Sequence, residues 1–173
     1  MLAYLQGLSL GLAYVAPIGV QNLFVINAGL SQPRAAAYRT ALIVIFFDVT
    51  LALAGFFGIG ALIEHSELIR KGVLLAGSLV VMYMGLRLML SREVAGPAIN
   101  VNIPLMKTIG MACVVTWFNP QAIIDVSLLL GSFRVALPPE ESGLFLWGVV
   151  CASCLWFLSL TTISSLFKNR FTP

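Results

Sequence analysis

The sequence predicts an all-α, polytopic membrane protein with five transmembrane helices. Of its 173 residues, 60% are apolar and only 10% are charged, whereas about 25% of the residues in a soluble domain are charged. The mean hydropathy is +0.99. The first charged residue is Arg34, so the chain opens with an apolar stretch longer than the roughly 20 residues that cross a hydrocarbon core. These observations exclude a soluble globular enzyme.

Five apolar segments, each closed by polar residues, are the expected spans of a single transmembrane domain over residues 1–173. They run at about Tyr4–Leu30, Thr40–Ile63, Gly72–Leu90, Leu105–Leu130 and Gly143–Phe167. Proline or charge closes each of them, in order at Pro33-Arg34, Glu64 to Glu67, Ser91-Arg92, Pro138 to Glu141 and Lys168. The third and fourth segments are separated by a polar connection that contains Gly96-Pro97 and ends at Pro104.

The basic residues at the ends of the spans predict the orientation. One side carries seven of them and the other three: Arg34, Arg39, Arg87, Arg92, Lys107, Lys168 and Arg170 against Arg70, Lys71 and Arg134. Because cytoplasmic loops carry the excess of Lys and Arg, we expect an outside N-terminus and a cytoplasmic C-terminus.

A motif in the first span returns in the fourth. Ala16-Pro17-Ile18-Gly19-Val20-Gln21-Asn22 and Trp117-Phe118-Asn119-Pro120-Gln121 each place a proline beside amide side chains well inside an apolar segment. The second copy lies three spans after the first, so it enters the membrane from the opposite side. This pattern is typical of inverted-repeat transporters, whose interrupted helices mark the substrate site. We expect a first repeat over about 1–95 and an incomplete second repeat over about 104–173.

The two prolines are expected to break their helices near the middle of the membrane. Proline removes a backbone hydrogen bond and leaves carbonyls free, and Gly19 makes a true break more favourable than a kink. The amides of Gln21, Asn22 and Asn119 would then face one cavity and bind the polar groups of a substrate. The alternative is a pair of kinked helices whose amides bond to neighbouring helices.

Two aspartates lie inside the apolar spans, at Asp48 in the second and Asp125 in the fourth. A carboxylate at that depth costs on the order of 3 kcal/mol, and no Lys or Arg lies at a comparable depth. We expect both carboxylates to bind a cationic substrate and to handle a proton, with Asp125 in the principal role and Asp48 in support. The alternative is a clamp between helices, in which a protonated Asp bonds to a neighbouring amide.

No cofactor or metal site is expected. Cys151 and Cys154 have the spacing of a thiol pair, but a buried cysteine is commonly a small apolar residue. No Cys/His cluster has the spacing of a zinc site, and no glycine loop suits a phosphate. The net charge of +3 is too small, and too clearly placed at span ends, to indicate a nucleic-acid partner.

Together these motifs resemble the LysE family of amino-acid exporters, most closely its lysine/arginine branch. The resemblance rests on the Pro17 to Asn22 motif, on Asp48, and on Asn119-Pro120 followed by Asp125, and it covers the whole chain in order. It implies a multi-pass protein of the bacterial inner membrane that exports a basic amino acid, arginine or lysine, by antiport with protons. Its partners would be that amino acid, the proton and membrane lipid.

The chain departs from this family in length, because members usually have six spans and a sixth is not found here. We expect a truncated member, and association into a homo-oligomer stays open as a source of further contacts. Three alternative functions remain: export of another small amino acid, export of a metal cation such as cadmium, and intramembrane aspartyl proteolysis. The sequence lacks the Gly-x-Gly-Asp element of such proteases, and two carboxylates without thiolates argue against a soft metal.

Overall fold

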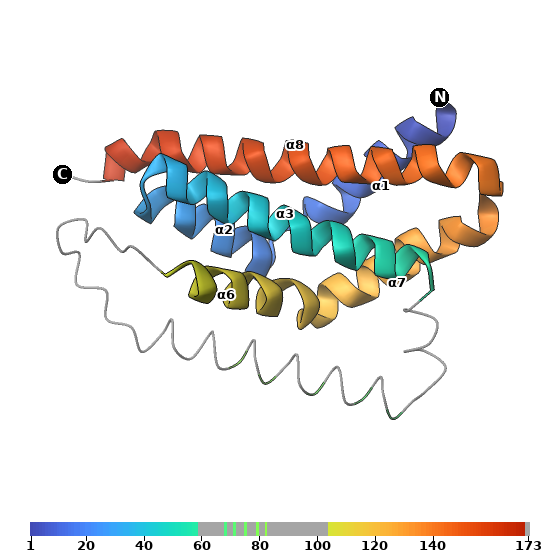
Figure 1. The fold of residues 1–173 in the computed structure, drawn as a ribbon, viewed down its shortest axis with the longest axis horizontal. Coiled ribbons are helices and arrows are strands. Elements are labelled where there is room, and N and C mark those ends of the chain that lie inside the picture. The colour runs from blue at the N-terminus through green and yellow to red at the C-terminus, as the bar shows by residue number, and fades with distance from the viewer. Residues whose placement is uncertain are drawn as a thin grey trace.

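The computed structural model describes residues 1–58, 68, 71, 75, 79, 82 and 104–171 of the chain. Across this described part the regular structure is entirely helical (Figure 1). The helices are α1 (Leu2–Val15), α2 (Val20–Ser31), α3 (Arg34–Phe56), α6 (Leu105–Trp117), α7 (Pro120–Ala136) and α8 (Pro139–Phe171). The expected third span, Gly72–Leu90, lies almost wholly outside the described residues.

Four of the expected spans correspond to elements that can cross a membrane by length and composition. Two are single helices, α3 and α8. The other two are bent pairs, in which α1 and α2 meet at 80° and α6 and α7 meet at 56°. The described residues thus hold two spans, or four if each bent pair is counted as one.

Two helices begin before the apolar segments expected from the sequence. Helix α3 begins at Arg34, directly after Pro33, rather than near Thr40. Helix α8 begins at Pro139. The proline and the acidic residues expected to lie between two spans therefore form the first helical turn of α8. Proline is favoured at the first helical position, and Glu140 and Glu141 lie at the positive end of the helix dipole. Hydropathy locates the membrane-buried part of a helix, and the helix itself extends into the interface.

Helix α8 runs the length of the bundle and packs against α1, α2 and α3 (Figure 1). The closest approach is to α1, where Gly7 and Gly148 lie against the partner helix's backbone. A Cβ atom at Gly7 would collide with the carbonyl of Phe145, and one at Gly148 with the carbonyl of Tyr4. Small residues of this kind allow membrane helices to pack backbone to backbone.

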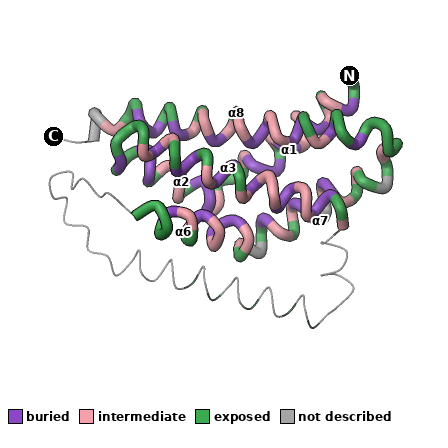
Figure 2. The backbone as a smooth tube through the Cα atoms, in the orientation of Figure 1, coloured by how far each residue is buried: buried purple, intermediate pink, exposed green. Residues whose placement is uncertain are grey.

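The described helices bury apolar and small residues between them and expose large apolar residues outward (Figure 2). An aromatic stack fixes one end of the bundle, with ring centroids 5.6 Å apart for Phe56 and Phe145 and 5.2 Å apart for Phe133 and Phe145. Side chains such as Phe46, Leu155 and Ile163 are more than half exposed. Apolar side chains exposed in this way suit contact with lipid, and they agree with the membrane class expected from composition.

Candidate functional site

The first helix break is held together by one amide side chain. Helix α1 ends at Val15 and α2 begins at Val20, with Pro17 between them. The Nδ2 atom of Asn22 donates to the carbonyl oxygens of Val15, at 3.0 Å, and Pro17, at 2.7 Å. Asn22 therefore satisfies carbonyls that the break removes from the helical ladder, as backbone groups away from water require.

The second break is capped by its own asparagine. Helix α6 ends at Trp117, and α7 begins at Pro120 with Asn119 as its N-cap. The Oδ1 atom of Asn119 accepts from the backbone N–H of Gln121 at 3.2 Å. Asparagine is among the strongest N-caps, and proline suits the position after it. The Asn-Pro-Gln sequence thus starts a new helix inside the apolar segment.

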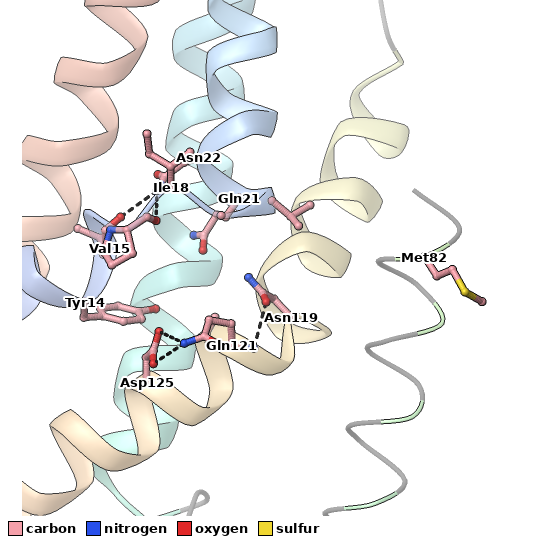
Figure 3. Close-up of a pocket in the computed structure, with 13 residues that line it drawn as sticks. Tyr14, Val15, Ile18, Gln21, Asn22, Met82, Asn119, Gln121 and Asp125 are labelled. Carbon is pink, nitrogen blue, oxygen red and sulfur yellow. Dashed lines mark hydrogen bonds between the residues drawn. The ribbon is translucent and has the colours of Figure 1, made fainter. Parts of the chain in front are cut away.

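The two breaks face each other across a pocket of about 500 Å³. A Cβ atom added to Gly19 would lie 4.0 Å from Nδ2 of Asn119, so the two unwound segments are close. Residues of α1, α2, α7 and the two breaks supply the walls, together with Met82 (Figure 3). The lining is Tyr14, Val15, Pro17, Ile18, Gly19, Val20, Gln21, Asn22, Met82, Asn119, Gln121, Ala122 and Asp125.

The structure brings most of the residues proposed from the sequence to this pocket. Gln21, Asn22, Asn119 and Asp125 all line it, as do Pro17 and Gly19. Asp48 is not among the lining residues. Its side chain lies behind Tyr14 and Gln21, and it is completely buried.

Asp48 is surrounded by hydrogen-bond donors from three other helices. Its Oδ1 atom accepts from the hydroxyl of Tyr14 at 2.7 Å and from Nε2 of Gln21 at 3.2 Å. Its Oδ2 atom accepts from the hydroxyl of Ser153 at 2.5 Å. The carboxyl group thus joins α3 to α1, α2 and α8.

Asp125 is in a different environment, although it belongs to the same region. It lies on the pocket wall and is partly exposed. The Nε2 atom of Gln121, one turn earlier on α7, donates to its two carboxylate oxygens at 2.8 and 3.0 Å. Both contacts come from one neutral amide, so the carboxylate remains open to a ligand in the pocket.

No Lys, Arg or His is among the described residues that line the pocket. Basic side chains in the described ranges lie near the ends of the bundle, for example Arg34 at the start of α3 and Lys168 near the end of α8. A search of the same ranges finds no group of three His, Cys, Asp or Glu residues placed to hold a metal ion. The described lining of the pocket therefore offers one carboxylate, several amides, the hydroxyl of Tyr14 and apolar walls.

Sequence reasoning missed three side chains that organise this region. Tyr14 lines the pocket and bonds to Asp48, Ser153 bonds to Asp48, and Trp156 donates to Oδ1 of Asn22 at 3.0 Å. Tyrosine, serine and tryptophan are common in apolar helices, so none of the three is recognisable as a site residue from its type alone. The one available signal is that Ser153 and Trp156 lie one turn apart on α8, and therefore on the same face.

A family model described as the LysE type translocator matches residues 12–172 of the chain. Similar curated proteins carry the name arginine exporter protein ArgO. The protein from Serratia proteamaculans is 32% identical over 166 residues, which is 94% of this chain and 80% of the relative. The protein from Escherichia coli strain K12 is 32% identical over 177 residues, which is 96% of this chain and 80% of the relative. A search of solved structures finds no match.

Proposed function

Because the chain belongs to the LysE type translocator family, we propose that it exports arginine across the bacterial inner membrane in exchange for protons. The family assigns it to transporters and not to enzymes. Similarity to proteins named as arginine exporters supports a basic amino acid as substrate. The observation that carries the proposal is Asp125, a carboxylate open to a pocket whose described lining includes no basic side chain.

The pocket has the polar groups that a cationic amino acid requires. Asp125 would pair with the guanidinium group, whose planar donors match a carboxylate in two parallel hydrogen bonds. The amides of Gln21 and Asn119 would bind the α-amino and α-carboxylate groups. The N-termini of α2 and α7, which lie at Gly19 and Asn119, favour a carboxylate. A volume of about 500 Å³ is within the usual range for small-molecule sites.

Asn22 would act indirectly. Both of its donor contacts go to carbonyls of the first break, and its oxygen accepts from Trp156. We propose that it fixes the shape of the unwound segment, while Gln21 and Asn119 contact the substrate.

The proposed architecture is an inverted repeat with five spans. The α1–α2 pair and the α6–α7 pair run in opposite directions along the bundle (Figure 1), as the two halves of such a repeat would. The starts of α3 and α6 and the end of α8 lie at one end of the bundle and carry Arg34, Lys107 and Lys168. By the positive-inside rule this end of the bundle (Figure 1) is the proposed cytoplasmic end, so the proposal has the N-terminus outside.

Proton exchange would solve the energetic problem of exporting a cation. Moving one positive charge outward against a negative interior costs roughly 2.3 kcal/mol per 100 mV. Entry of one proton for each arginine that leaves cancels this charge movement and adds the pH gradient as a driving force. A carboxyl group suits the exchange because it can hold a proton or pair with a cation. Asp125 would be the principal site of that competition, and Asp48 would support it as a second carboxyl group that can hold the proton.

Transport by purified protein in lipid vesicles tests the proposal. Vesicles loaded with labelled arginine are given a pH gradient while the membrane potential is clamped, and the efflux of label is measured. In separate samples, counterflow is compared with arginine, lysine, a neutral amino acid or cadmium added outside. We expect counterflow with arginine and acceleration by a gradient that drives protons inward. Efflux indifferent to the gradient would reject proton exchange, and counterflow with cadmium alone would reject the amino-acid substrate.

A further inference from the structure

The buried carboxyl group of Asp48 has hydrogen-bond partners that suit two protonation states. None of its partners in the described structure is a cation: they are the hydroxyls of Tyr14 and Ser153 and the amide of Gln21. A buried carboxylate that stayed charged would normally have a cationic partner. A hydroxyl can donate to an ionised carboxylate and can also accept from a protonated carboxyl group. These hydrogen-bond partners therefore suit a carboxyl group that gains and loses a proton.

The three partners differ in their access to the pocket. Ser153 is completely buried and does not line it. Gln21 lines the pocket, but a neutral amide does not readily take up one proton and release another. Tyr14 lines the pocket and also carries a hydroxyl that contacts Asp48. Of the three, Tyr14 alone combines pocket exposure with a group that can relay a proton.

Other ionisable groups near this contact come, within the described ranges, from α7 and α8. Asp125, on α7, lines the same pocket as Tyr14. On α8, Cys154 directly follows Ser153, which bonds to Asp48. The side chain that α2 contributes to this contact is that of Gln21, which is not ionisable. Tyr14 thus contacts the buried carboxyl group of Asp48 and lines the same pocket as Asp125, beside which Figure 3 shows its ring.

We propose that the hydroxyl of Tyr14 carries protons between the pocket and Asp48. The Tyr14 O–H bond breaks as its proton moves to Oδ1 of Asp48, while the phenol oxygen takes a proton from a hydronium ion in the pocket. Tyrosine ends unchanged, Asp48 becomes neutral, and the hydronium ion becomes water. The reverse sequence discharges Asp48. A guanidinium group at Asp125 favours the ionised form of Asp48 by Coulomb attraction, so binding of arginine releases the proton.

This inference rests on the proposed exchange of arginine for protons, and two assays separate them. The first measures net efflux driven by a pH gradient, and the second measures exchange of labelled for unlabelled arginine at equal pH, which requires no net proton transfer. For Tyr14→Phe we expect gradient-driven efflux to fall at least tenfold, while exchange at equal pH falls less than threefold. Equal losses of gradient-driven efflux and of exchange in Tyr14→Phe would overturn the role of Tyr14. Absence of gradient-driven efflux in the wild-type protein would instead reject proton exchange itself.

Two variants serve as controls. Tyr38→Phe removes a tyrosine hydroxyl that bonds to Thr162 at 2.8 Å, away from the pocket, and should change neither assay. Ser153→Ala removes the other hydroxyl from Asp48 but leaves the pocket route intact. It should slow gradient-driven efflux and exchange by similar factors. A selective loss of gradient-driven efflux in Ser153→Ala, with no such selective loss in Tyr14→Phe, would assign the proton path to Ser153.

Infrared spectroscopy provides a readout that does not depend on transport. The carbonyl stretch of protonated Asp48, identified by its loss in Asp48→Asn, is followed after a rapid pH change in protein held in lipid nanodiscs. We expect Tyr14→Phe to slow the appearance of this band at least tenfold. A band that appears at the wild-type rate in Tyr14→Phe contradicts the proposal even if that variant transports nothing.

Discussion

The indole Nε1 of Trp156 donates to Oδ1 of Asn22 at 3.0 Å and so connects α8 to the first turn of α2. The same asparagine satisfies the carbonyls of Val15 and Pro17 with its amide nitrogen. A continuous helix thereby holds an interrupted one in shape, through a single amide with every polar atom in use.

Replacing Asn22 by alanine should destabilise the protein, because two carbonyls at the break lose their partner. A buried polar group without a partner costs about 1–3 kcal/mol, so we expect a loss of several kcal/mol in the free energy of unfolding. Trp156→Phe removes one hydrogen bond and should cost about 1 kcal/mol. Unfolding in detergent measures both. Asn27→Ala, at an exposed position of the same helix, is the matched control, and an equal loss there would contradict the role of Asn22.

Replacing Gly7 by alanine should separate α1 from α8, because the new methyl group meets the backbone of Phe145. Overpacking of this kind typically costs about 1–3 kcal/mol, and a backbone neighbour cannot move aside as a side chain can. Gly148→Ala should behave similarly, since its Cβ meets the backbone of α1. At Gly143 an added Cβ has no described atom within 4 Å, so Gly143→Ala should be tolerated. Thermal unfolding that ranks Gly143→Ala with Gly7→Ala would be inconsistent with this packing.

Asp125→Asn should abolish arginine transport while the protein still folds and inserts. The change removes the charge that would bind the guanidinium group, but it keeps the size and hydrogen-bonding capacity of the side chain. We expect at least a hundredfold loss of counterflow with an unchanged melting temperature. Asp48→Asn should also fail in transport, and glutamate at either position should restore part of the activity. Full transport by both asparagine variants would show that the two carboxyl groups are only structural clamps.

Asn119→Asp should separate helix capping from substrate binding. Aspartate is as good an N-cap as asparagine, so α7 and the stability of the protein should be preserved. The variant loses the Nδ2 donor and places a negative charge where the substrate carboxylate is proposed to bind. We therefore expect the KM for arginine to rise at least tenfold. Asn119→Ala provides the comparison, because it should lose about 1 kcal/mol of stability with the cap.

The proposed orientation predicts which side of the membrane each end of the bundle faces. In a variant in which Cys113, Cys151 and Cys154 are replaced by serine, a cysteine introduced at Glu141 should react in intact cells with a reagent that cannot cross the inner membrane. A cysteine at Arg34 should react only after the membrane is opened. The reverse pattern of labelling would place the N-terminus in the cytoplasm.

The sequence was sufficient to predict the membrane class and the positions of most pocket residues. Proline inside an apolar segment interrupts a membrane helix, and an amide or a carboxylate at that depth is energetically costly. Both kinds of residue can therefore be recognised in the sequence as candidates for a site. Residues that pack against a site cannot be recognised in the sequence in this way. The proximity of Ser153 to Asp48 depends on how α8 crosses α3, and residues more than one hundred positions apart leave no local pattern. The separate environments of Asp48 and Asp125 likewise follow from packing, because both appear in the sequence as aspartates in apolar segments.

The unbroken helix α8 has a mechanical consequence. It lies against α1, α2 and α3. At Gly7 of α1 and Gly148 of α8, no side chain separates the two backbones, so the two helices cannot easily slide past each other. We therefore expect α1 and α8 to stay together as one rigid body during transport, and the α6–α7 pair to move relative to α2. A disulfide that joins α1 to α8 should leave turnover intact, whereas one that joins α2 to α6 should arrest it with the pocket open to a single side.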